Sequence, residues 1–140
     1  MHTVYQLVMT DEGASYDDHK EEFNIGFFSS RNAAEKTAAR YLSEVKGFKD
    51  YDITCRITEK PLIGAYDVSA QPDIFIIYGW NENDEFDETD VIESDCYLSI
   101  EDAEIRLNEM RAAYKRKEWC IDKYTIDNCC WQEGFEKVYH

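Results

Sequence analysis

The feature that most constrains the fold is an internal repetition, in which one pattern of residues occurs twice at an interval of 70 positions. Residues 4–8 align with 74–78, and residues 27–29 align with 97–99. Few aligned positions are identical, so the case rests on the order of apolar, polar and capping residues. Self-similarity at a fixed interval indicates repeated supersecondary units. The sequence therefore predicts two tandem units of one architecture.

Each unit is expected to contribute three strands, which are rich in β-branched and aromatic residues. The alternation of Ile53, Cys55 and Ile57 is typical of a strand with one apolar face. The expected strands cover residues 3–9, 23–28 and 53–57 in the first unit, and 74–78, 92–98 and 120–126 in the second.

A helix is expected between the second and third strands of each unit. Ser29 or Ser30 is the expected N-cap of the first helix, because serine hydroxyls accept hydrogen bonds from the free amides of a first helical turn. Ser99 is the expected N-cap of the second, where Asp102 approximates a capping box. The apolar face of this second helix has helical spacing and comprises Ala103, Leu107, Met110 and Tyr114.

The predicted fold class is α+β, with two tandem β-β-α-β repeats that form a largely antiparallel sheet packed against two helices in a pseudo-twofold arrangement. The repeats are expected to cover residues 1–66 and 72–140, with residues 61–72 as the linker. Units of this size bury little surface alone. We therefore expect the two repeats to be fused into one globular domain.

Negative charge is concentrated in one part of the chain. Thirty acids and fifteen bases leave a net charge of −15, and residues 61–105 contain thirteen acids with no Lys or Arg. Such a surface repels the phosphates of nucleic acids and attracts cations or cationic proteins. The charge pattern thus argues against nucleic-acid binding and predicts a basic protein partner.

Composition places the chain among cytoplasmic proteins. It has no apolar run near the roughly 20 residues of a membrane helix, and its N-terminus lacks the basic and apolar regions of a signal peptide. The number and spacing of its five cysteines do not match a disulfide framework. We expect reduced thiols and no membrane association.

The acidic connector at residues 81–90 suggests calcium, because this hard cation prefers many oxygen ligands at alternate positions. An EF-hand loop that began at Asn81 would place Phe86 where the turn needs glycine and Ile92 where a bidentate glutamate belongs. A solvated loop is therefore favoured, with an irregular weak cation site as the alternative. No metal or cofactor is predicted.

No catalytic motif is visible. The spacing of Cys120, Cys129 and Cys130 matches neither a zinc site nor a redox C-x-x-C motif. Cys55 and Cys96 lie in expected strands and are interpreted as small core residues. Phosphate-binding, dinucleotide-binding and hydrolase motifs do not occur. The sequence therefore predicts a protein that is not an enzyme.

Three large aromatic residues are candidates for partner binding, because aromatics contribute much of the buried area at interfaces while acids steer a basic partner. The alternative is that these aromatics plug the ends of the core. The predicted partner-binding residues are Trp80, Glu82, Asp84, Glu85, Asp87, Glu88, Asp90, Trp131 and Phe135.

Four short segments carry a resemblance to a known pattern. Residues 25–30 contain an aromatic-Ser-Ser sequence before an Ala-rich stretch, and residues 47–50 read Gly-Phe-x-Asp. Residues 121–124 read I-D-x-Y and residues 131–135 read W-x-E-G-F. Together they resemble a family of small uncharacterised bacterial proteins classed as a domain of unknown function.

This family normally occurs as a single copy, so the chain looks like two copies that keep different parts of the pattern. The first copy lacks W-x-E-G-F and the second lacks Gly-Phe-x-Asp. The resemblance supports the fold and implies no activity.

The leading hypothesis for function is a non-enzymatic, acidic protein-binding module, of which an immunity or inhibitor protein is one concrete form. The alternative is a small-molecule or cation-binding domain with a pocket between the repeats, walled by residues such as Tyr5, Phe75 and Tyr78.

Overall fold

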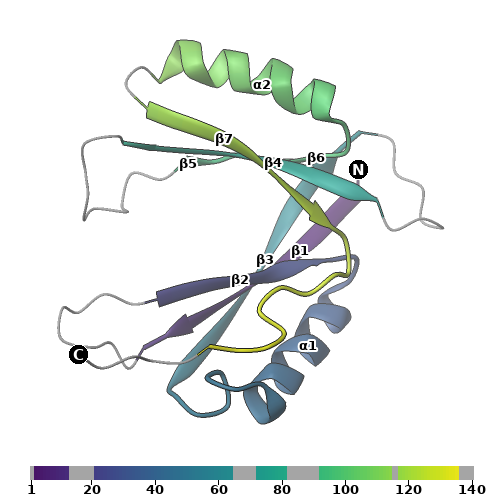
Figure 1. Ribbon diagram of the computed structural model, residues 1–140. Coiled ribbons are helices and arrows are strands. Elements are labelled where there is room, and N and C mark those ends of the chain that lie inside the picture. The colour runs from purple at the N-terminus through teal and green to yellow at the C-terminus, as the bar shows by residue number, and fades with distance from the viewer. Residues whose placement is uncertain (1, 13–20, 65–71, 82–91, 115–116, 136–140) are drawn as a thin grey trace. The chain divides into compact units, whose positions relative to one another are not determined.

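The computed structural model describes residues 2–12, 21–64, 72–81, 92–114 and 117–135, which contain seven strands and two helices (Figure 1). The elements are β1 (His2–Asp11), β2 (Glu21–Phe28), α1 (Arg31–Glu44), β3 (Ile53–Ile63), β4 (Asp73–Asn81), β5 (Ile92–Glu93), β6 (Cys96–Tyr97), α2 (Ile100–Ala113) and β7 (Lys117–Thr125).

The chain forms two compact units. The first unit comprises Thr3–Lys60 together with the chain from Ile126 onward, and the second comprises Pro61–Thr125 with the N-terminal end. These boundaries differ from those of the predicted repeats, because the last part of the chain packs with the first unit. We call its described part, residues 126–135, the C-terminal segment.

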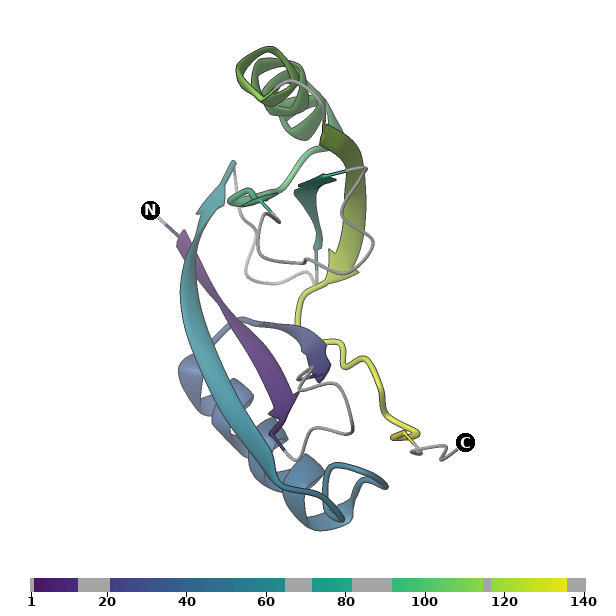
Figure 2. The same cartoon turned by 90° about the vertical axis from the view of Figure 1, so that its left-hand side faces the viewer.

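The first unit is a three-stranded sheet in the order β2-β1-β3, with α1 against one of its faces (Figure 2). β1 and β2 are antiparallel, and their register shifts between Leu7 and Val8. Ser30 caps α1 by accepting a 3.1 Å hydrogen bond from the Ala33 amide. Ala34, Ala38 and Tyr41 recur at helical spacing and form the buried face of α1.

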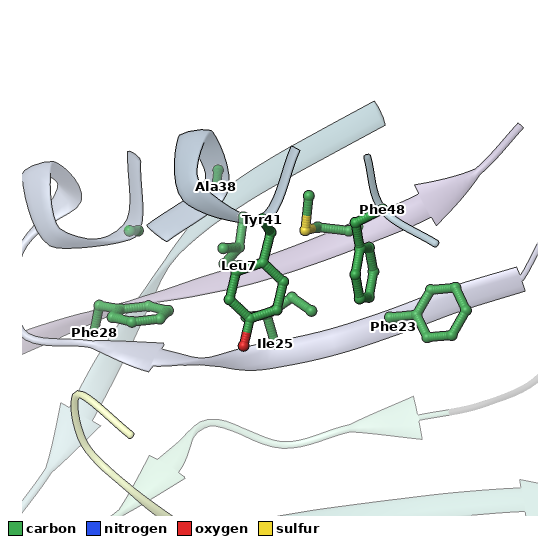
Figure 3. Packing of buried hydrophobic residues seen from close by; sticks show 9 residues of the cluster. Leu7, Phe23, Ile25, Phe28, Ala38, Tyr41 and Phe48 are labelled. Carbon is green, nitrogen blue, oxygen red and sulfur yellow. The ribbon is translucent and has the colours of Figure 1, made fainter. Parts of the chain in front are cut away.

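The core of the first unit lies between this helix face and the sheet (Figure 3). Alternate residues of β1 and β2 point to the same face of the sheet, which brings their apolar side chains to α1. The cluster consists of Leu7, Met9, Phe23, Ile25, Phe28, Ala34, Ala38, Tyr41 and Phe48.

The second unit is centred on β4, which pairs antiparallel with β5 and β6 and with β7. The end of β3 pairs with β6 in parallel through Leu62 and Ile63, so the sheet is mixed. α2 begins after Ser99, whose hydroxyl accepts from the Asp102 amide at 3.1 Å. Ala103, Leu107 and Met110 pack against the sheet residues Ile77 and Tyr97.

Ser94 occupies the break between β5 and β6. Its amide donates to the Ile77 carbonyl at 2.9 Å, and its hydroxyl accepts from the Ile77 amide at 2.8 Å. The side chain thereby replaces a backbone acceptor at a position where the strand leaves the ladder. Because Ser94 is buried, its hydroxyl provides the Ile77 amide with an acceptor at a place that water cannot reach.

The predicted α+β class and both helices are confirmed, with caps at Ser30 and Ser99. The predicted strand over residues 92–98 is interrupted at Ser94 and Asp95. β3 continues to Ile63, so residues 61–63 are strand and not linker.

The prediction of two core cysteines is half right. Cys96 is buried, whereas Cys55 is exposed. Ile53 and Ile57 pack only at the margin of the first core. The apolar alternation of this strand therefore marks the margin of the core and not its centre.

Replacement of Ser94 by Ala is expected to lower the free energy of unfolding by about 1–3 kcal/mol, because it leaves the buried Ile77 amide without its acceptor. Urea denaturation followed by circular dichroism measures the loss. Ser43→Ala is the control, since Ser43 is exposed on α1. Equal stabilities of the two variants would contradict this role of Ser94.

Candidate functional site

The acidic connector predicted to bind a partner lies outside the described residues. The structure places its two ends, at Asn81 of β4 and Ile92 of β5. The proposed cation loop falls in the same stretch. The predicted residues concerned are Glu82, Asp84, Glu85, Asp87, Glu88 and Asp90.

The described acids of residues 61–105 are all exposed. They lie at the start of β4, around the β5–β6 break and in the first turns of α2. Counted by sequence, the second unit carries sixteen acids and six bases, and the first carries fourteen acids and nine bases. The acidic excess is thus greater in the second unit. The described, exposed acids of residues 61–105 are Asp73, Glu93, Asp95, Glu101, Asp102 and Glu104.

Trp80 lies on β4 close to the acidic connector, and 38% of its surface is exposed. Its neighbour Gly79 pairs with Trp119 of β7. A Cβ at Gly79 would lie 2.5 Å from the Trp119 ring, so the indole covers the backbone there. Because successive residues of a strand point to opposite faces, Trp80 points away from this contact.

Trp131 and Phe135 lie in the first unit, and their surroundings differ. Trp131 is 48% exposed and meets the Phe23 ring edge-on, with centroids 4.8 Å apart. Phe135 is half-buried and stacks on Phe23 at 4.6 Å, with Phe48 at 5.0 Å. Phe135 therefore contributes to the core, as the alternative interpretation expects, while about half of the Trp131 surface stays exposed to solvent.

The C-terminal segment follows the edge of β2. The Asp127 amide donates to the Phe27 carbonyl at 2.8 Å, and the Cys130 amide donates to the Ile25 carbonyl at 2.7 Å. The Asp127 carboxylate accepts from the Ser29 amide at 2.9 Å and from the Ser29 hydroxyl at 2.8 Å. Backbone and side chain together tie residues about 100 positions apart in the sequence.

The segment ends against the turn that follows α1. The Phe135 amide donates to the Lys46 carbonyl at 3.1 Å. A Cβ at Gly134 would lie 2.1 Å from that same oxygen, and one at Gly47 would lie 2.5 Å from the Phe135 ring. Both positions require glycine, because the two backbones approach too closely for any side chain.

The structure thereby brings W-x-E-G-F and Gly-Phe-x-Asp together in the first unit, although the sequence assigns them to different copies. Sequence reasoning missed this contact. The signal that points to it is that each of the two motifs occurs only once in the chain, as expected if they pair with each other in a single unit.

A cavity of about 340 Å³ lies in the first unit beside the C-terminal segment. Its wall carries two cationic and two carboxylate side chains. The lining residues are Arg40, Tyr41, Glu44, Val45, Lys46, Gln132 and Glu133.

Arg40 and Tyr41 connect the cavity wall to two cysteines. An Arg40 guanidinium nitrogen lies 3.6 Å from the Cys129 sulfur, and the Tyr41 hydroxyl donates to the Cys130 carbonyl at 2.7 Å. Burial raises the pKa of Tyr41 to about 12, Cys129 adds to the rise and Arg40 opposes it. The Tyr41 hydroxyl therefore remains a hydrogen-bond donor throughout the physiological range.

Tyr78 forms a second polar group, in the second unit. Its hydroxyl lies 3.4 Å from a carboxylate oxygen of Glu93 and 3.4 Å from the Tyr124 hydroxyl. Burial, the hydrogen bond with Tyr124 and the charge of Glu93 raise the pKa of Tyr78 far above its ordinary value. A phenol in this state serves as a donor and not as a base. The sequence predicts that Tyr5, Phe75 and Tyr78 wall a pocket between the repeats. Tyr5 belongs to the first unit, whereas Phe75 and Tyr78 belong to the second.

Within the described ranges, no group of three or more His, Cys, Asp or Glu residues is arranged to hold a metal ion. No described helix is long and apolar enough to cross a membrane.

Comparisons with protein-family models, with curated proteins and with solved structures find no match for this chain. The resemblance to the small bacterial family remains a prediction, which depends on its four short motifs.

Replacement of Gly134 by Ala is expected to lower the free energy of unfolding by about 2 kcal/mol or more, because the residue has φ +79° and its Cβ would meet the Lys46 carbonyl. Urea denaturation of both variants tests this, with Glu133→Ala as the control at the exposed neighbouring position. If both variants unfold at the same urea concentration, the close approach of the two backbones is not formed.

Tyr41→Phe is expected to reduce the loss of stability between pH 10 and pH 12. The folded pKa of Tyr41 is about 12 and the ordinary value is 10.0, so the hydroxyl contributes stability below pH 10 that is lost as the pH rises through 12. Urea midpoints measured across this range test the prediction. Tyr114→Phe serves as the comparison, since Tyr114 is exposed. Parallel alkaline losses in wild type and Tyr41→Phe would refute it.

Proposed function

We propose that the chain is a non-enzymatic, acidic protein-binding module that engages a basic protein partner through its second unit. The observation that carries this proposal is the charge distribution: residues 61–105 contain thirteen acids and no base, and every described acid among them is exposed. Acids gathered on one unit produce a field that steers a cationic partner to it.

Trp80 supplies the apolar part of the proposed surface. It is an exposed indole on the strand that leads directly into the acidic connector. Interfaces depend on a few large aromatic anchors, whereas charges at the rim mainly accelerate association and select the partner. The combination fits a partner with a Lys- and Arg-rich surface around an apolar pocket.

An immunity or inhibitor protein is one concrete form of this function. A small acidic protein can block a basic active site, such as that of a nuclease, by occupying the place of the phosphates. The same field disfavours nucleic acid as a direct ligand of the second unit. A cytoplasmic location accords with the free cysteines of the described chain.

We also propose that the two units arose by duplication. In the first unit, β1 lies between β2 and β3. In the second, β4 lies between β5–β6 and β7. The helix joins the second and third strands in each, and both helices span 14 residues. The shared strand order supports a tandem β-β-α-β origin.

The alternative function is binding of a small molecule or cation. The cavity of about 340 Å³ in the first unit favours it, because Arg40, Lys46, Glu44 and Glu133 all line it. This support applies to a site within the first unit and not to a pocket between the repeats. A thermal-shift screen with amino acids and divalent cations tests it, and no shift with any ligand at high concentration counts against it.

Neutralisation of the acidic connector at residues 81–90 tests the leading proposal. Partners are first recovered by pull-down at low salt, and the purified cationic protein is titrated calorimetrically at two salt concentrations. Asp84→Asn, Asp87→Asn and Asp90→Asn together are expected to weaken binding about tenfold and to flatten its salt dependence, because acidic steering is lost.

The matched control removes three charges from the corresponding stretch of the first unit, between its first two strands, through Asp17→Asn, Asp18→Asn and Glu22→Gln. It is expected to change affinity by less than about threefold, since the partner engages the second unit. Equal losses in the two triple variants, or no specific protein at low salt, would overturn the proposal.

A further inference from the structure

Two adjacent thiols lie at the point where the C-terminal segment meets α1. An Arg40 nitrogen lies 3.6 Å from the Cys129 sulfur, and Arg40 also lies over the Tyr41 ring at 5.4 Å. Cys129 is half-buried at the margin of the first core, and Cys130 is exposed. The sequence alone shows two thiols without a motif, and the fold adds a fixed cation.

The two thiols have different surroundings. A cation beside a cysteine sulfur stabilises negative charge on it, and the thiolate is the nucleophilic form of cysteine. The Cys129 sulfur has the Arg40 guanidinium as this neighbour. Cys130 has no such cation in the described contacts, and desolvation together with the neighbouring Cys129 raises its pKa. This division matches the roles of an attacking and a resolving thiol.

The thiol pair is open to small solutes from the solvent, because Cys130 is exposed and Cys129 is only half-buried. Arg40 and Tyr41, which contact Cys129 and Cys130, also form part of the wall of the 340 Å³ cavity. The cavity therefore adjoins the thiol pair, although neither cysteine lines it.

We propose that Cys129 is a peroxide-reactive thiol and that Cys130 resolves its oxidised form into a disulfide between the two adjacent residues. The Cys129 thiolate attacks one oxygen of hydrogen peroxide, so that an S–O bond forms, the O–O bond breaks, and the leaving hydroxide takes a proton to become water. The Cys130 sulfur then attacks the sulfenic sulfur of Cys129, the S–O bond breaks, and a second water leaves. Two thiols are oxidised and one peroxide is reduced to two waters.

A disulfide between Cys129 and Cys130 closes a small ring, and this ring affects the docking of the C-terminal segment. The peptide unit inside the ring carries the Cys129 carbonyl, which accepts from Gln132 at 2.8 Å, and the Cys130 amide, which donates to Ile25 at 2.7 Å. Ring closure is expected to constrain this peptide unit and to move the Cys129 sulfur away from the Arg40 guanidinium. Oxidation is thus expected to loosen the segment from β2, independently of the acidic surface of the second unit.

The chain provides its own comparison thiol. Cys120 is also half-buried, but its sulfur lies 3.9 Å from a carboxylate oxygen of Asp122. Burial raises the pKa of Cys120 and the Asp122 charge adds to the rise. Cys129 and Cys120 therefore differ chiefly in the sign of the neighbouring charge.

The first experiment exposes the full-length wild-type chain to a limiting amount of iodoacetamide and maps the alkylated cysteines by mass spectrometry. Cys129 is expected to react at least about fivefold faster than Cys120, because its sulfur lies beside a guanidinium and the Cys120 sulfur lies beside a carboxylate. Equal rates, or faster alkylation of Cys120, would overturn the proposal without any substitution.

The second experiment treats the chain with hydrogen peroxide in a background of Cys55→Ser and Cys120→Ser. A loss of two hydrogen masses on the peptide that contains Cys129 and Cys130 is the expected result. In Cys130→Ser, dimedone is expected to trap a sulfenic acid on Cys129. Dimedone labelling on another cysteine alone, or no disulfide in the parent background, would refute the assigned roles.

Arg40→Gln tests the role of the cation, with Lys36→Gln as a control that removes the same charge from the same helix. Oxidation is expected to slow about three- to tenfold in Arg40→Gln and to stay within about twofold of the parent in Lys36→Gln. Arg40→Lys is expected to restore part of the rate, because it keeps the charge. Equal rates in the two Gln variants would show that Arg40 does not activate Cys129.

Discussion

The docking of the C-terminal segment on the first unit is the constraint on which the rest of the structure depends. Asp127 holds Ser29 through its carboxylate, the Cys130 amide extends the edge of β2, and Phe135 enters the aromatic group around Phe23. Each interaction is modest alone, of the order of 1 kcal/mol for a hydrogen bond. Together they close a core that residues 3–60 leave open at one edge, and they place Arg40 beside a thiol.

Local signals in the sequence predict the elements well. The serines before each helix, the apolar spacing of α2 and the aromatic strands all depend on neighbouring residues, which sequence displays directly. The packing of Phe135 on Phe23 and the parallel pairing of Leu62 with Cys96 join distant residues. No local pattern encodes such pairings, and the repeat itself misleads, because it suggests that each copy keeps its own last residues.

The candidate site shows the same division. The acidic connector is a contiguous stretch of the sequence, and Trp131 and Phe135 lie within one short motif, so both could be identified from local sequence. The contact of Arg40 with Cys129 spans 89 positions and had no signal in the chain. The two units also differ in character. The second carries the greater charge excess, while the first holds the cavity of about 340 Å³, the Cys129–Cys130 pair and the C-terminal segment.

The position of the C-terminal segment, late in the sequence, has a consequence for biosynthesis. Ser29 and Asp127 are 98 positions apart, so the first unit to leave the ribosome is the last to receive all its contacts. Until residues 126–135 emerge, the edge of β2 and the rings of Phe23 and Phe48 stay uncovered. Contacts of such long range slow folding and prolong the exposure of apolar surface. In a nascent chain, the first unit therefore gains its last contacts only after residues 61–125 have been synthesised, although its own strands emerge before them.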